Sequence, residues 1–598
     1  MLSAFGRAPS HQVESATYHG QHAVCVLLRQ GPDTLNPAAQ PHESSRRAIV
    51  ACGYYELASG TAGRLEPPFA NGNAGRLQHV LADGRPAALA QGDGVYAFAS
   101  WDRECERLTA GVDKLGMRPL YWRALPGGGH AIASELKTLI ALAPMPRTNW
   151  AALEEQLSFG FIFGDHTLFQ GVDRFGIAEV IEFDRRGVRR AQSEDFLSGI
   201  SVSDQSLETF VEEQHELFDR TMHRLSRLYD ARESSMLTLS GGHDSRRVLA
   251  WMISRDIRPK AYTVPEVRPD GSEYESAIVA ELCRSAGLDG QAIYPTSVLE
   301  RLSVSDARDV STDFQADEHG FSVMLAMAIA PTPRINFDGL AAGSQLSGSF
   351  VTPRLFRAGA DDSFLSSLPR SARFWLSFPG EDTAPPLAQR VRAELSRWAG
   401  DPNRFAYFYL ASRTRREIAL APLCIQANVF ESLYPFLDRQ MMRSALRFPP
   451  QLKIGAGLQG RLANKQCPLL ANIPTIYSTG IAKDQRYCIR MGAIEHGARR
   501  ATLKRAANAR LQAACYPKGS RQQWRFQAAR AVAAVGQGER RLRWEHAKAA
   551  KIDQLLNFER LGESTDRYIA AADDVARQYG THAGWCQSLG DPGWRQCS

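Results

Sequence analysis

Residues 237–247, with the sequence Leu-Thr-Leu-Ser-Gly-Gly-His-Asp-Ser-Arg-Arg, constrain the fold of this chain more than any other stretch. The short apolar run 236–239 predicts a buried strand. The paired glycines Gly241 and Gly242 predict a turn where the backbone approaches another group closely. From Ser245 onward the apolar residues recur at helical spacing. A strand, a glycine turn and a helix leave unpaired backbone N–H groups aimed at one point, so this stretch predicts a phosphate site.

The string Ser-Gly-Gly-x-Asp-Ser at residues 240–245 differs from two better-known phosphate loops. It has neither the Lys-Ser/Thr of the Walker loop nor a third glycine at dinucleotide spacing. The string resembles the pyrophosphate loop of enzymes that split ATP into AMP and pyrophosphate, which implies ATP as a ligand. Asp244 would repel phosphate unless a divalent cation lay between them, so it is interpreted as a ligand of Mg²⁺. An ordinary strand-to-helix turn is the alternative interpretation.

Strands alternate with helices after this loop. Residues 259–264 and 291–294 are predicted strands, and residues 273–287 a predicted helix. This alternation predicts a doubly wound α/β sheet with its ligand at the carboxyl ends of the strands. We predict that adenine lies near the backbone of Leu239, Tyr262 and Thr263. The full set of residues predicted to bind the nucleotide is Leu239, Ser240, Gly241, Gly242, Asp244, Ser245, Tyr262 and Thr263.

The first ~190 residues carry short strand signals separated by glycine and polar turns. Residues 94–102, 113–121, 134–137 and 167–172 resemble, in the correct order, the amino-terminal half of asparagine synthetases. The resemblance implies an N-terminal-nucleophile (Ntn) hydrolase-like αββα sandwich, with two antiparallel sheets between helices. We therefore predict a degenerate glutaminase-like domain over residues 1–195. An ATP-pyrophosphatase domain with helical additions, of the adenine nucleotide α-hydrolase-like type, is predicted over residues 203–598.

The family's glutaminase uses a cysteine at position 2, where removal of Met1 exposes the amine that acts as its base. This chain has Leu2 at that position, and Cys25 and Cys52 lie inside predicted strands. We therefore predict that this half does not hydrolyse glutamine and has a structural or substrate-binding role.

Further candidate residues lie downstream. Asp338 follows the apolar stretch 335–337 and is predicted to be a second catalytic carboxylate and Mg²⁺ ligand, with a loop-capping aspartate as the alternative. The acidic pair that follows this position in asparagine synthetases is absent. Residues 431–438 and 446–450 resemble the family's later block, in which Glu431 and Asp438 are interpreted as hydrogen-bond acceptors. Lys465 is chosen as the catalytic cation from Arg461, Lys465 and Lys483, any of which could be a surface charge.

Composition limits the class of protein. With 598 residues, 44% of them hydrophobic and 23% charged, the chain is predicted to hold more than one globular domain. The ten cysteines include no CxxC pair, so neither a zinc site nor a disulfide framework is indicated. No signal-peptide core or apolar stretch of membrane-spanning length is present, which favours a soluble, cytoplasmic protein. The net charge of +7 gathers over residues 490–551, a face suited to an acidic peptide or phosphate, or to plain solvation. Nucleic acid is disfavoured because few aromatic residues interleave with these charges.

A synthetase half without a glutaminase must use another amine. The superfamily members that fit this description are β-lactam synthetases and lasso peptide macrolactam cyclases. We favour the cyclase, because the basic C-terminal region suits a peptide and Arg246 replaces the usual second serine after the loop. The resemblance then implies an AMP-forming carbon–nitrogen ligase acting on a precursor peptide, with a leader peptidase and a leader-binding protein as further partners. An ammonia-dependent asparagine synthetase or a small-molecule amide synthetase of the β-lactam type remains the alternative.

Overall fold

The computed structural model describes a large part of the chain. The described residues are 46–56, 92–126, 128–140, 146–191, 195–228, 235–265, 275–293, 308, 311–313, 315–316, 319–329, 335–346, 385–453 and 457–475. The backbone is also described for β1 (Val13–His19), β2 (Val24–Gln30), β3 (His42–Glu43) and β17 (Gln596–Cys597). The basic region 490–551, Lys483 and Leu2 lie outside the described residues.

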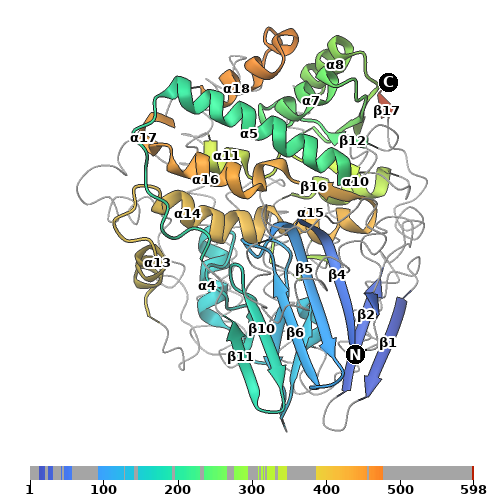
Figure 1. The fold of residues 1–598 in the computed structure, drawn as a ribbon. Coiled ribbons are helices and arrows are strands. Elements are labelled where there is room, and N and C mark those ends of the chain that lie inside the picture. The colour runs from blue at the N-terminus through green and yellow to red at the C-terminus, as the bar shows by residue number, and fades with distance from the viewer. Residues whose placement is uncertain are drawn as a thin grey trace, which may run out of the picture.

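Two antiparallel sheets form the N-terminal half (Figure 1). The larger has the order β11-β10-β6-β5-β4-β3 and the smaller the order β8-β7-β9, while β1 and β2 pair as a hairpin. The strands are β4 (Arg47–Glu56), β5 (Asp93–Asp102), β6 (Arg107–Val112), β7 (Tyr121–Ala124), β8 (His130–Ala133), β9 (Val172–Arg174), β10 (Val180–Asp184) and β11 (Gly187–Ala191).

The two sheets pack face to face. Apolar side chains of the larger sheet, such as Ala97 and Phe183, meet Trp122 and Ile132 of the smaller one. The outer face of the smaller sheet is covered by α3 (Leu136–Ile140) and α4 (Trp150–Phe159). The predicted pair of antiparallel sheets with helices is therefore confirmed.

The C-terminal half contains a sheet with the order β16-β15-β12-β13-β14-β17, in which the first five strands are parallel. These strands are β12 (Ser235–Thr238), β13 (Lys260–Thr263), β14 (Gly290–Ile293), β15 (Ile335–Phe337) and β16 (Glu431–Leu433). Counted along the chain, the spatial order is 5-4-1-2-3, so the winding direction reverses between β12 and β15. In open parallel sheets, this reversal leaves a crevice at the carboxyl ends of the two strands, and ligands bind there.

Helices cover both faces of this sheet. On one face, Leu237 and Ala261 pack against α5 (Leu207–Leu228), α7 (Asp244–Ser254) and α8 (Glu275–Ala286). On the other, Met236 and Tyr262 pack against α10 (Phe321–Ala328) and α15 (Leu420–Cys424). The predicted doubly wound arrangement is confirmed.

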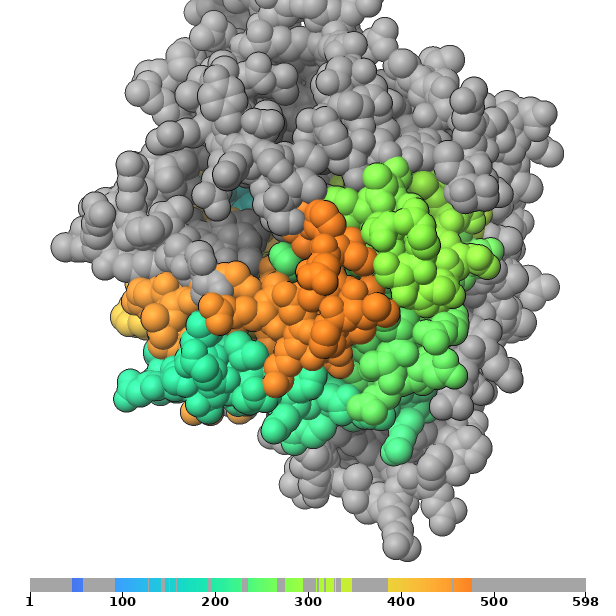
Figure 2. Space-filling view, turned by 90° about the horizontal axis from the view of Figure 1, so that it is seen from above, coloured from blue at the N-terminus to red at the C-terminus, as the bar shows by residue number. Residues whose placement is uncertain are grey.

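The remaining helices connect and cover the two halves (Figure 1). They are α11 (Ala342–Leu346), α13 (Leu387–Ser396), α14 (Arg404–Tyr409), the π-helix η4 (Leu410–Ile418), the 3-10 helices η5 (Gln426–Asn428), η6 (Pro435–Leu437) and η7 (Pro468–Leu470), α16 (Arg439–Arg447), α17 (Pro450–Lys453) and α18 (Leu458–Gln466). Figure 2 shows residues 457–475 (orange) between α5 (teal) and α8 (green), which agrees with the contacts of α18 with α5 and α7, and of η7 with α8.

Buried polar contacts join the two halves. The guanidinium of Arg118 lies 2.7 Å from Glu431, and the Tyr434 amide donates to the hydroxyl of Tyr54. Asp438 caps α16 by accepting from the Met441 amide at 2.8 Å. The interpretation of Glu431 and Asp438 as hydrogen-bond acceptors is confirmed. The domain boundaries themselves stay a prediction.

Candidate functional site

The glycine loop (residues 239–243) joins the carboxyl end of β12 to α7, as the sequence predicts. Its two serines close the loop, because the hydroxyl oxygens of Ser240 and Ser245 lie 3.0 Å apart and the Ser240 amide donates to Ser245 Oγ at 3.0 Å. The Gly242 amide approaches Ser240 Oγ at 3.4 Å. The hydroxyls of Ser240 and Ser245 therefore hold the loop in its conformation.

One loop amide already holds an anion. The Gly241 amide donates to Oε1 of Glu275 at 2.9 Å, and Glu275 is the first residue of α8. The expectation of loop amides without partners is therefore wrong at Ser240, Gly241 and Gly242. A carboxylate oxygen stands where a phosphate oxygen was expected, so a phosphate could reach this amide only by displacing Glu275.

Asp244, the first residue of α7, is half-buried beside the loop. The Gly343 amide and the side-chain amide of Gln459 donate to its carboxylate. Burial raises the pKa of Asp244 to about 7, although Gly343, Arg247 and Gln459 oppose that shift, and the nearby Asp338 adds to it. A cation bound beside a buried carboxylate stabilises its charged form.

Asp338 lies next to Asp244, as the sequence predicts. Gly339 follows Asp338 directly. A Cβ atom on Gly339 would stand 2.9 Å from Cβ of Asp244, so only glycine lets the backbone after Asp338 come this close to Asp244. Oδ1 of Asp338 accepts from the Leu340 amide at 2.9 Å, the bond of a loop cap, while Thr238 and Asn336 approach Oδ2 at 3.4 and 3.5 Å. Burial raises the pKa of Asp338.

Asp244 and Asp338 offer carboxylate oxygens, the ligand type that a hard cation such as Mg²⁺ prefers. Among the residues that the structure describes, no group of three or more His, Cys, Asp or Glu side chains could hold a metal ion. Asp244 and Asp338 would therefore need nucleotide phosphates and water to complete the coordination.

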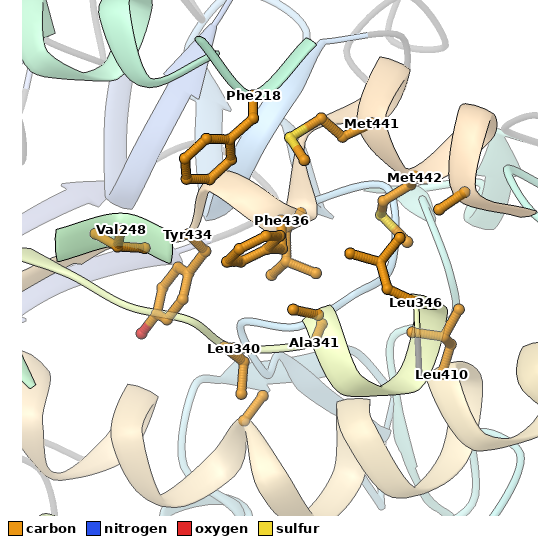
Figure 3. Close-up of a cluster of buried hydrophobic side chains, with 14 of the residues drawn as sticks. Phe218, Val248, Leu340, Ala341, Leu346, Leu410, Tyr434, Phe436, Met441 and Met442 are labelled. Carbon is orange, nitrogen blue, oxygen red and sulfur yellow. The ribbon is translucent and has the colours of Figure 1, made fainter. Parts of the chain in front are cut away.

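The segment after Asp338 joins the hydrophobic core. Leu340, Ala341 and Leu346 are buried, and Figure 3 shows them beside Tyr434 and Phe436. Buried apolar residues therefore stand where asparagine synthetases carry an acidic pair after this position.

The residues predicted to contact adenine lie side by side, but their contacts are internal. The Leu239 amide donates to the Tyr262 carbonyl at 2.8 Å. The side chains of Leu239, Tyr262 and Thr263 are buried, Tyr262 among the apolar residues between the sheet and α10. A role for these residues in nucleotide binding would depend on their remaining backbone groups.

Lys465 lies at the end of α18, and its ammonium pairs with Glu212 of α5 at 2.7 Å. The structure therefore gives it an acidic partner on α5, and neither Asp244 nor Asp338 is among its hydrogen-bond partners. Gln459, earlier in the same helix, contacts Asp244 instead, and Gly460 packs on the ring of His243.

The two arginines after the loop have structural contacts. Arg246 donates to the carbonyls of Ile473 and Pro474 at 2.6 and 2.7 Å. Arg247 donates to the Gln214 carbonyl at 2.6 Å and stacks on the ring of Phe218. The contacts of Arg246 account for an arginine at this position without a peptide substrate, so this residue no longer favours the cyclase.

No helix in the described part of the chain combines the length and apolar character needed to cross a membrane.

Comparisons with known proteins find a family similarity in one region of the chain. Residues 73–194 match the family described as glutamine amidotransferase domain. No curated protein matches the chain significantly. Among solved structures, the B. subtilis glutamine phosphoribosylpyrophosphate (PRPP) amidotransferase complexed with ADP and GMP is 12% identical, with 50% of this chain and 87% of that chain covered. Its TM-score of 0.23 is too low to support a conclusion. The match over residues 73–194 fits the asparagine synthetase superfamily, whose amino-terminal half this region resembles.

Proposed function

We propose that the chain is an ATP-dependent, AMP-forming amide synthetase that activates the Asp or Glu side chain of a precursor peptide and closes it onto the peptide's N-terminal amine. The observation that carries the proposal is the position of the glycine loop with Asp244 and Asp338, at the point where the winding of the parallel sheet reverses. The basic region 490–551 is the remaining support for a peptide substrate.

The proposed reaction has two steps. A carboxylate oxygen of the substrate attacks the α-phosphorus of ATP, and the bond to the β-phosphate oxygen breaks, so pyrophosphate leaves and an acyl-AMP forms. The amine then attacks the acyl carbon, AMP leaves and one proton is released. Mg²⁺ held by Asp244 and Asp338 would neutralise phosphate charge. The loop amides and serine hydroxyls would bind the pyrophosphate oxygens. An amine bound next to the acyl-AMP would react faster, because its effective concentration at the acyl carbon is high.

The test measures AMP and pyrophosphate release by the full chain with Mg²⁺ and ATP. Four conditions are compared: a synthetic peptide with a free N-terminal amine and one glutamate side chain, the same peptide N-acetylated, aspartate with ammonium, and no acceptor. We expect AMP and a product lighter by one water only with the free peptide. AMP release with aspartate and ammonium instead would replace the proposal by ammonia-dependent asparagine synthesis, and ADP as the nucleotide product would overturn both.

Glu275 predicts a measurable effect on nucleotide binding. Since its carboxylate occupies the Gly241 amide, a phosphate must displace it, and Glu275→Gln removes the competing charge. We expect the variant to bind pyrophosphate about 5- to 10-fold more tightly, or roughly 1 kcal/mol, by isothermal titration calorimetry. Glu281→Gln, on an exposed position of the same helix, is the matched control and should bind as the wild type does. Equal or weaker binding by Glu275→Gln would contradict the displacement.

A further inference from the structure

A histidine–glutamate pair lies near Asp338. The His319 ring has Nδ1 at 3.2 Å from Oε1 of Glu417. Because a carboxylate accepts, the neutral imidazole that fits this contact carries its proton on Nδ1 and presents Nε2 as an acceptor. This is the tautomer in which an imidazole can take a proton from a substrate.

The topology places this pair at the edge of the sheet that carries the glycine loop. The chain must return from the carboxyl end of β14 to the amino end of β15, so α10, which lies between them, runs against the strands. His319 precedes the first turn of α10 and so lies towards the carboxyl ends. The elements around Asp338 agree, because Ser344 of α11, the helix that follows Asp338, lies 3.0 Å from Thr414 of η4, the helix that carries Glu417.

Glu417 is buried within a helix that contacts the N-terminal half. It lies in the π-helix η4 and is 2% exposed, and such helices recur at functional sites. Its neighbours fix the turn, since Arg416 donates to the carbonyls of Gly164 and His166 at 2.6 and 2.9 Å, and Arg415 bonds to Asp165 at 3.0 Å. The N-terminal half thereby positions the carboxylate that orients His319.

His319 itself is constrained. Its backbone has φ +66°, a left-handed conformation that is uncommon for residues other than glycine. Its ring meets Phe321 edge to face at 5.4 Å between centroids, and 18% of its side chain stays exposed. The imidazole is therefore fixed in direction and still accessible, as a base that contacts substrate must be.

We propose that His319, positioned by Glu417, is the general base that deprotonates the attacking amine; this inference rests on the proposed function. An N–H bond of the substrate ammonium breaks and its proton passes to Nε2 of His319. The nitrogen lone pair forms the bond to the acyl carbon, the bond between that carbon and the AMP oxygen breaks, and the second proton of the nitrogen passes to solvent as the amide forms. The Glu417 carboxylate stabilises the imidazolium that results.

The experiment separates the two half-reactions in the full chain. Adenylation is followed by ATP–pyrophosphate exchange with the free-amine glutamate peptide, and amide formation by the cyclised product. In His319→Gln we expect amide formation to fall about 100-fold or more, with exchange within about threefold of wild type. Hydroxylamine, whose nitrogen is already unprotonated at neutral pH, should still be acylated. In Glu417→Gln amide formation should fall about tenfold with exchange retained, and imidazole should partly rescue His319→Ala.

His223→Gln is the matched control, because His223 forms another histidine–carboxylate pair, 3.7 Å from Asp219 on α5, and its side chain is 47% exposed. It should form amide at the wild-type rate. Parallel loss of exchange and amide formation in His319→Gln, or loss of neither, would overturn the role of His319. Absence of exchange and AMP release in the wild type would overturn the proposed function, and this inference with it.

Discussion

Replacing Asp244 by asparagine is expected to reduce AMP release by at least about 100-fold, a loss of roughly 2.7 kcal/mol of transition-state stabilisation. The proposed Mg²⁺ needs Asp244 and Asp338 together, because the described residues offer no third acidic side chain beside them. Asparagine keeps the shape of Asp244 and an oxygen that accepts from the Gly343 amide, but it removes the charge. Metal sites built on few carboxylates lose most of their affinity when one becomes neutral.

Asp244→Asn should leave the fold intact and its thermal stability unchanged or higher. Asp244 is a half-buried carboxyl beside a second one, and both burial and that neighbour disfavour its charged form. Thermal unfolding of Asp244→Asn should therefore occur at or above the wild-type temperature while AMP release is lost. Asp256→Asn, an exposed aspartate just beyond the other end of α7, should change neither measurement. An Asp244→Asn variant with wild-type AMP release would remove this residue from the mechanism.

The strands and helices around the site could be predicted because their signals are local. The apolar run before Ser240, the glycines and the helical spacing after Ser245 placed β12 and α7 within a residue or two of their observed ends. The proximity of Asp338 to Asp244 also followed from a local rule. Both residues follow parallel strands, and the carboxyl ends of such strands meet at one edge.

The contacts that complete the site depend on segments far apart in the chain. Glu275 reaches Gly241 because β13 neighbours β12 and α8, which begins at Glu275, packs on the same face of the sheet as α7, an adjacency that helical periodicity does not report. The choice of Lys465 shows the same limit. Lys465 lies on the helix that contacts Asp244 through Gln459, but residues six apart on a helix point about 120° away from each other. Gln459 therefore faces Asp244, while Lys465 faces α5.

The ion pair between Arg118 and Glu431 is expected to contribute strongly to the union of the two halves. Both side chains are at most 9% exposed, and their atoms lie 2.7 Å apart although the residues are 313 positions apart in the chain. Glu431 begins β16, which pairs with β15, the strand that leads to Asp338. Removal of one partner leaves a buried charge without its counter-ion, so Arg118→Met should lower the free energy of unfolding by about 3–5 kcal/mol, measured by urea denaturation.

A double variant shows whether Arg118→Met lowers the free energy of unfolding by leaving the Glu431 charge unpaired or by removing packing contacts. Arg118→Met combined with Glu431→Gln removes both charges, and buried pairs replaced together often cost little, so the double variant should be more stable than Arg118→Met alone. Arg284→Met breaks an exposed pair with Glu281 and should cost less than about 1 kcal/mol. Equal losses in the single and double variants would show that the Arg118 side chain acts by filling space. Recovery in the double variant would show that Arg118 stabilises the protein chiefly as the counter-ion of Glu431, and so fixes β16 against the N-terminal sheet by charge.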